Sequence, residues 1–410
     1  MPRAGRLGWG VGAGIAVLGA TSLIFGGLAP EASAEDIRSH QWYLETMQAP
    51  QMWKVSKGQG VTVAVVDTGV RDSLPELRGK VLPGKDFTEA PTGAHRDTSG
   101  HGTNMAALVA GSGEGGGIQG LAPEASILPI KIPVDKGVGF GDSNISRAIR
   151  YAVDGGAKVI NISVASAGTP SSFPATQRAV DYALRKGVLI FAGVGNDGEK
   201  GNPIEFPAAL PGVVGVASVD RSVQVSKFSN HGDQVALAAP GQDIPEYCTK
   251  TQGNCIAWGT SQATALASAS AALIWAKHPK WTNYQVLRVM MQTAGRPDWG
   301  DVPSDYVGYG AVRPRLALLE GKGDPGPADV NPLLAREGAN HPAPSASAST
   351  GESAQPTSSP QPKSPAPAPS HAAAKDDSDG DGKAVWIGVG VAAVVSIGAV
   401  GLMLARRRRH

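Results

Sequence analysis

Three short motifs place an aspartate, a histidine and a serine where nucleophilic catalysis could use them. Asp67 ends the apolar run 61–66 and is followed by a glycine turn. His101 stands between two glycines, and Ser261 opens the alanine-rich segment 262–277, which has the composition of a helix. These side chains together could carry out acyl transfer, with the serine as nucleophile, the histidine as base and the aspartate as its partner.

Each motif alone has an ordinary structural explanation. Aspartates at strand ends cap helices or bind metals, and an isolated histidine is usually a satisfied structural residue. A serine such as Ser261 at a helix start is usually a cap. The helix start also offers N–H groups and a positive dipole end, which stabilise negative charge beside a nucleophile. The combination therefore favours catalysis over three unrelated structural roles.

The order of the motifs resembles that of the subtilisin family, the subtilases. Asp67 and His101 are 34 residues apart (101 − 67), and His101 and Ser261 are 160 apart (261 − 101). The resemblance covers roughly residues 56–320 and implies a serine endopeptidase that acts on protein or peptide substrates. It also gives Asn196, after the apolar run 188–194, the role of an oxyanion-hole donor, although Asn-Asp-Gly is also a common turn.

The resemblance further implies substrate-binding segments, and it assigns no cofactor and no metal. Residues 111–120 match a family calcium loop in length but are mainly glycine. Ala165 stands where the family commonly has glycine, and the added methyl group would narrow the pocket for the first substrate side chain, so we expect a small or restricted residue there. The expected substrate-binding residues are Gly139, Ser163, Val164, Ala165 and Gly195.

Apolar runs alternate with helical patterns between the three motifs. Runs that are apolar throughout are typical of parallel strands covered on both faces. We therefore predict an α/β fold, a subtilisin-like doubly wound parallel sheet flanked by helices, with a single C-terminal transmembrane helix. The predicted strands are 61–66, 126–132, 158–163, 188–192 and 213–218, and the clearest helices are 143–154 and 174–186.

The two ends of the chain predict export and anchoring. Residues 1–34 have the arginines, apolar stretch and Ala-Ser-Ala ending of a signal peptide. Residues 384–405 are uncharged and long enough to span a bilayer, and the arginines within 406–410 place the tail in the cytoplasm and the catalytic domain outside. An N-terminal extension (35–57) should lie along the protease domain (58–320), and a Pro/Ala/Ser-rich disordered linker (321–383) should follow that domain.

The only two cysteines are Cys248 and Cys255, both on the exported side. A disulfide closing a short loop is the favoured interpretation, and two free thiols are the alternative.

The whole architecture resembles the mycosins, membrane-anchored proteases associated with type VII secretion. That resemblance implies a type VII secretion membrane complex as a partner. The alternative is a membrane-tethered scaffold of that complex with secondary protease activity. A net charge of +2 gives no reason to expect nucleic acid, and 5% aromatic residues argue against a glycan-binding module.

Overall fold

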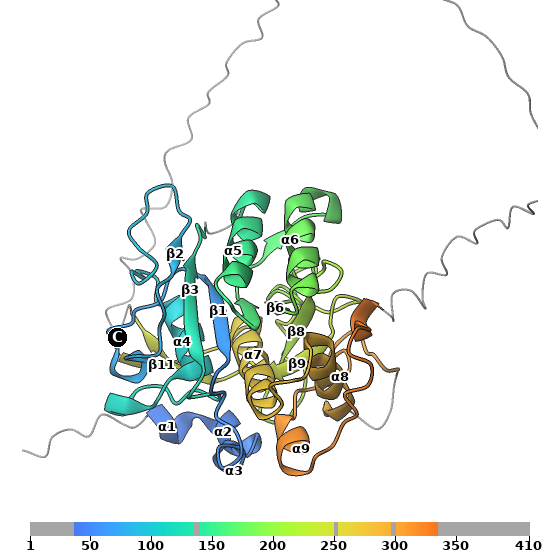
Figure 1. Ribbon diagram of the computed structural model, residues 1–410. Coiled ribbons are helices and arrows are strands. Elements are labelled where there is room, and N and C mark those ends of the chain that lie inside the picture. Colours follow the sequence, from blue (N-terminus) through green and yellow to red (C-terminus); the bar gives the residue numbers. More distant parts are fainter. Residues whose placement is uncertain (1–36, 135–139, 250–252, 297–300, 335–410) are drawn as a thin grey trace, which may run out of the picture. The chain divides into compact units, whose positions relative to one another are not determined.

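A parallel sheet forms the centre of the molecule (Figure 1). The computed structural model describes residues 37–134, 140–249, 253–296 and 301–334. In these residues seven strands form a sheet in the order β2-β3-β1-β4-β6-β8-β9, all parallel. The strands are β1 (Thr62–Asp67), β2 (Lys85–Asp86), β3 (Ser126–Lys131), β4 (Val159–Ile162), β6 (Leu189–Gly193), β8 (Val214–Val219) and β9 (Leu237–Pro240).

The five predicted strands are confirmed to within one residue at either end. Two further strands were not predicted: β2 has only two residues, and the Leu-Ala-Ala-Pro run of β9 is short and weak in β-branched residues. Two antiparallel pairs lie outside the main sheet. They are β5 (Ser166–Ala167) with β7 (Glu205–Phe206), and β10 (Ile244–Cys248) with β11 (Gly253–Ala257).

Helices cover both faces of the sheet, as alternating side chains in β1 illustrate. Val63 and Val65 enter the core that contains α4 and α7, whereas Ala64 and Val66 enter the core that contains α5 and α6. The apolar runs are therefore explained by burial on both sides. The helices are α4 (His101–Ala110), α5 (Asp142–Asp154), α6 (Pro174–Arg185), α7 (Thr260–Lys277), α8 (Asn283–Thr293) and α9 (Pro314–Leu319), with short 3₁₀ turns at Pro75–Leu77, Glu114–Gly116 and Pro170–Ser172.

The N-terminal extension is packed into the domain through α1 (Ile37–His40), α2 (Trp42–Thr46) and α3 (Ala49–Met52). Leu44 is fully buried in the core shared with α7. Ser56 Oγ donates a 2.7 Å hydrogen bond to the carbonyl oxygen of Leu273 on α7. The segment was expected to lie along the domain. The structure shows in addition that side chains of the extension form part of the hydrophobic core of the domain.

The packed chain also continues past position 320, the predicted end of the protease domain. Arg288 of α8 donates hydrogen bonds to the carbonyl oxygens of Pro327 (2.9 Å) and Val330 (2.6 Å), and Leu333 is buried. Proline-rich composition suggested a disordered linker from residue 321, but residues 321–334 are hydrogen-bonded to α8 through Arg288, Gln285 and Gln292.

Several predicted segments lie outside the described residues: the signal peptide 1–34, the linker from residue 335, the membrane span 384–405 and the tail 406–410. Among the residues that are described, none of the helices combines the length and hydropathy needed to cross a bilayer.

Candidate active site

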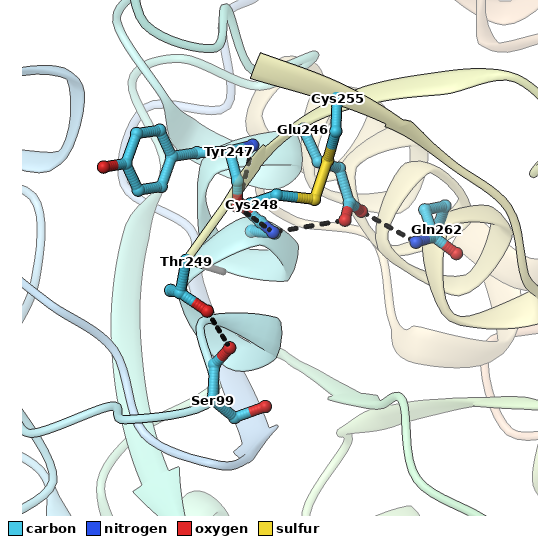
Figure 2. The surroundings of a disulfide bond; sticks show 8 residues. Ser99, Glu246, Tyr247, Cys248, Thr249, Cys255 and Gln262 are labelled. Atoms are coloured by element: carbon cyan, nitrogen blue, oxygen red, sulfur yellow. Dashed lines mark hydrogen bonds between the residues drawn. A yellow bond between two sulfur atoms is a disulfide. The ribbon is translucent and has the colours of Figure 1, made fainter. Parts of the chain in front are cut away.

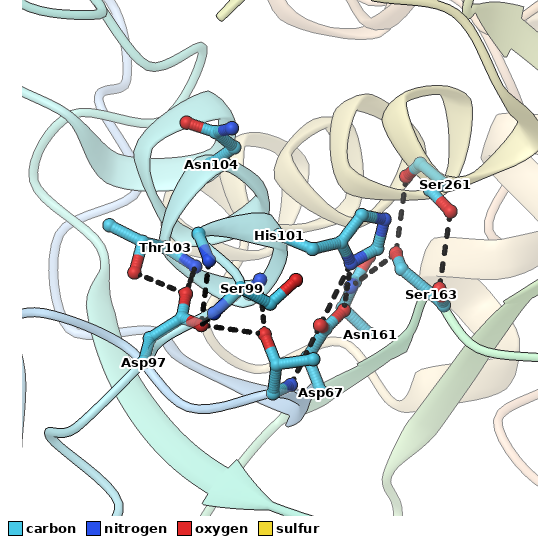
Figure 3. A network of polar contacts seen from close by, with 12 residues as sticks. Asp67, Asp97, Ser99, His101, Thr103, Asn104, Asn161, Ser163 and Ser261 are labelled. Carbon is cyan, nitrogen blue, oxygen red and sulfur yellow. Dashed lines mark hydrogen bonds and ion pairs between the residues drawn. The ribbon is translucent and has the colours of Figure 1, made fainter. Parts of the chain in front are cut away.

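Asp67 and His101 meet where a strand end faces a helix start (Figure 3). Asp67 is the last residue of β1 and is fully buried, and His101 is the first residue of α4. His101 Nδ1 lies 2.8 Å from Asp67 Oδ1 and 2.9 Å from Oδ2. A Cβ on Gly102 would lie 2.3 Å from the carbonyl oxygen of Gly69 and 2.9 Å from Asp67 Cβ. Only glycine therefore allows α4 to approach β1 closely enough for this contact.

A second carboxylate, Asp97, fixes the loop that leads into α4. Its Oδ1 accepts from the backbone N–H groups of Ser99 and Gly100, and from Thr68 Oγ1 at 2.9 Å. Its Oδ2 accepts from the backbone N–H and the hydroxyl of Thr103. Since Asp97 is itself buried, these bonds stabilise its charge and hold the start of α4 in place.

The electrostatic surroundings of His101 favour the imidazolium. Burial alone lowers the pKa of His101, but the charge and hydrogen bond of Asp67 outweigh it, and the more distant charges of Glu246 and Asp97 act in the same direction. The pKa of His101 is therefore raised above its ordinary value. One third of the His101 side chain is exposed, whereas Asp67 is fully buried.

Ser261 lies in the first turn of α7 and is joined to the segment after β4. The Ser261 hydroxyl donates to the backbone oxygen of Ser163 at 3.1 Å, and the Ser163 hydroxyl donates to the backbone oxygen of Ser261 at 3.1 Å. Asn161 Nδ2 donates in turn to Ser163 Oγ at 2.9 Å. Figure 3 shows His101 between Asp67 and Ser261. The structure thus joins Asp67 directly to His101, while the hydroxyl of Ser261 is bonded to the backbone of Ser163.

Asn196 follows β6 and contacts the residue before the serine. Its Oδ1 accepts a 2.8 Å hydrogen bond from the backbone N–H of Thr260, which is buried. The backbone N–H of Gly195 donates to Thr260 Oγ1 at 3.3 Å. This bond occupies Oδ1, so the NH₂ group is the part of the Asn196 side chain that can donate a further hydrogen bond.

The predicted substrate-binding residues are partly described. Ser163, Val164 and Ala165 follow β4 directly, and Gly195 precedes Asn196, so these four lie beside the proposed catalytic groups. Gly139 lies outside the described residues.

Glu246 of β10, which was not predicted as a site residue, is a buried carboxylate that links α4 and α7 (Figure 2). Glu246 accepts from Asn104 Nδ2 of α4 at 3.1 Å and from Gln262 Nε2 of α7 at 2.7 Å. Burial raises the pKa of Glu246, while His101 and the two amide donors oppose that increase. The only signal in the sequence was a single amide side chain, Asn104 or Gln262, in each of two helix starts rich in small residues.

Cys248 and Cys255 form a disulfide with their Cα atoms 5.9 Å apart, across the β10–β11 hairpin (Figure 2). Next to it, Thr249 Oγ1 donates to the backbone oxygen of Ser99 at 3.0 Å. A Cβ on Gly100 would lie 2.6 Å from Thr249 Cγ2. The hairpin thus contacts the loop that leads into His101.

A serine, a histidine bonded to a carboxylate and an asparagine amide are the types of group that acyl transfer requires. In the parts of the chain that the structure describes, no three His, Cys, Asp or Glu residues lie close enough to hold a metal ion.

Comparisons with known proteins agree with this geometry. The subtilase family model matches residues 58–323. Thermitase of Thermoactinomyces vulgaris is 37% identical over 238 residues, covering 58% of this chain and 82% of the relative. The crystal structure of MycP1 from Mycobacterium smegmatis has a TM-score of 0.61 at 28% identity, covering 70% of this chain and 86% of that one. MycP3 protease from the type VII (ESX-3) secretion system has a TM-score of 0.59 at 30% identity, covering 68% and 87%.

Proposed function

Because the chain belongs to the subtilase family and is a subtilisin-type serine endopeptidase related to the mycosins, we propose that Asp67, His101 and Ser261 are its catalytic triad. The observation that carries this proposal is the 2.8 Å contact of His101 Nδ1 with the buried carboxylate of Asp67, beside a serine in the first turn of α7. A buried carboxylate bonded to a half-open imidazole serves to orient it and to stabilise its charged form.

In the proposed mechanism the Ser261 hydroxyl rotates from its hydrogen bond with Ser163 toward His101 Nε2. Its oxygen attacks the substrate carbonyl while His101 takes the proton. The oxyanion accepts hydrogen bonds from Asn196 Nδ2 and the Ser261 backbone N–H. The C–N bond then breaks as His101 returns the proton to the leaving amine. Water hydrolyses the acyl-enzyme by the same steps in reverse order.

The triad is tested by labelling the full-length chain with a fluorophosphonate, which reports an activated serine without a known substrate. Wild type should be labelled, and Ser261→Ala and His101→Ala should not. Thermal unfolding of each protein controls for folding. If folded wild type remained unlabelled, or if Ser261→Ala were labelled equally, the proposed triad would be wrong.

We also propose that the chain is exported and anchored in the cell membrane by residues 384–405. The N-terminal pattern 1–34, the uncharged C-terminal run and the arginines that follow it support this topology. In intact cells, external protease should digest the domain, while a tag placed after His410 should be protected. Domain and tag protected alike would contradict the orientation.

The similarity to MycP1 and MycP3 supports a role in type VII secretion, with a membrane complex as partner. A strain that lacks the gene for this protein, complemented with wild type or with Ser261→Ala, distinguishes a role that needs proteolysis from a role as a scaffold. If wild type restores secretion and Ser261→Ala does not, proteolysis is required. Restoration by both would favour a scaffold with secondary protease activity, and restoration by neither would contradict the secretion role.

A further inference from the structure

Glu205 is a carboxylate that the catalytic steps above do not use. It begins β7, which pairs antiparallel with β5 so that Glu205 stands opposite Ala167. Directly opposed residues of an antiparallel pair place their side chains on the same face of the ladder. Because β5 follows the substrate-binding residues 163–165 directly, Glu205 lies beside the segment where an extended substrate would pair.

The Glu205 carboxylate also touches the segment of the oxyanion donor. A Cβ on Gly195 would lie 2.7 Å from Glu205 Oε2 and 2.8 Å from its Cδ. Gly195 directly precedes Asn196, whose amide is placed to bind the carbonyl oxygen of the scissile bond. The side chain on the same substrate residue as that carbonyl must lie close by. The carboxylate therefore faces the pocket for the residue on the amino side of the cleaved bond.

Glu205 has no partner that compensates its charge. Within the described residues nothing donates a hydrogen bond to its carboxylate or forms an ion pair with it, and the residue is half-buried. The neighbouring Asp197 is engaged by Lys200 at 3.4 Å. Burial, and secondarily the charge of Asp197, raises the pKa of Glu205 to about 7. A cation entering with the substrate would reduce this penalty and gain a charge-assisted hydrogen bond.

An unbranched side chain fits the surroundings of Glu205. Phe206, the next residue of β7, lies on the opposite face of the strand, where it is buried and stacks on Phe173 with ring centroids 4.9 Å apart. The methyl group of Ala165 narrows the pocket where subtilases commonly have glycine. The expectation of a small residue considered Ala165 alone, whereas an unbranched side chain meets the same limit on width and also reaches the carboxylate. Lysine and arginine combine a methylene stem, which packs on apolar surface, with a cationic end.

We propose that Glu205 is the specificity-determining residue of this protease and selects lysine or arginine on the amino side of the scissile bond. This inference rests on the proposed active site, because it assigns the pocket from the position of Asn196.

The proposal is tested on the full-length chain with two peptidyl phosphonates, Ala-Ala-Lys and Ala-Ala-norleucine, which differ in the ammonium group. Wild type should react with the lysine probe roughly 10 to 100 times faster. Glu205→Gln should reduce this ratio to nearly one, whereas the control Asp197→Asn should keep it within about threefold of wild type. Both rates are measured on one protein, so a loss of folded material cancels.

Equal rates in wild type, or an unchanged ratio in Glu205→Gln, would overturn the proposal. A second measurement does not require a reactive serine: binding of fluorescent p-aminobenzamidine to Ser261→Ala, and to the same variant carrying Glu205→Gln. The amidinium should bind at least about tenfold more weakly without the carboxylate. If the fluorophosphonate failed to label wild type, the proposed triad would be wrong. The difference in amidinium binding between Ser261→Ala with and without Glu205→Gln would still decide the role of Glu205.

Discussion

Replacing Asn196 by aspartate should separate its role in catalysis from its role in folding. In the structure Asn196 has one evident structural role: its Oδ1 accepts a 2.8 Å hydrogen bond from the buried backbone N–H of Thr260. Aspartate is nearly isosteric and keeps this acceptor next to a helix N-terminus, where a negative charge is favourable. It loses the Nδ2 donor, so acylation should slow by about 10² to 10³ while stability is retained.

Asn196→Ala is the matched comparison, because it removes both functions. It should slow acylation by a similar factor and also leave the buried N–H of Thr260 unpaired, which costs about 1–3 kcal/mol in the free energy of unfolding. The assays are the second-order rate of fluorophosphonate labelling and urea denaturation. Rates are compared on the alkaline plateau, so that a changed pKa of His101 does not contribute. Labelling of Asn196→Asp within about threefold of wild type would refute the oxyanion role.

Three further perturbations test the site and its supports. Because Asp67 raises the pKa of His101 and only neutral imidazole accepts a proton, labelling should increase with pH through a midpoint above about 6.5, and a lower midpoint would contradict the ion pair. Gly102→Ala should slow labelling about 10²-fold, since its Cβ would lie 2.3 Å from the Gly69 oxygen; an unchanged rate would show that the close approach is dispensable. Leu44→Ala should lower the free energy of unfolding in urea by about 2–5 kcal/mol while leaving labelling per folded molecule unchanged, and a neutral effect would mean that the extension is not part of the core.

Local patterns were sufficient to predict five of the seven strands of the sheet and to single out the residues of the proposed site. A strand buried on both faces must be almost continuously apolar, so runs such as 61–66 and 188–192 can be recognised in the sequence. Asp67 and His101 were recognisable because the glycines around them are needed for close packing. Ser261 was recognisable from the helix that follows it.

Other features depend on neighbours that are remote in the chain, and only the tertiary structure decided them. The three helices in residues 37–52 have four or five residues each, too few to show a helical period, so their burial against α7 could not be read from the sequence.

The two acidic residues beside the site depend on the fold in the same way. The carboxylate of Glu246 accepts hydrogen bonds from the side-chain amides of Asn104, 142 residues before it, and Gln262, 16 residues after it. Glu205 is left without a partner beside Gly195 because β5 and β7 pair there. The letter for glutamate in a sequence is the same whether the fold places its carboxylate in solvent, in a structural network or in a substrate pocket. The sequence determined which residues could do chemistry, whereas the charge and shape of the pocket around them were decided by which distant segments the fold brought into contact.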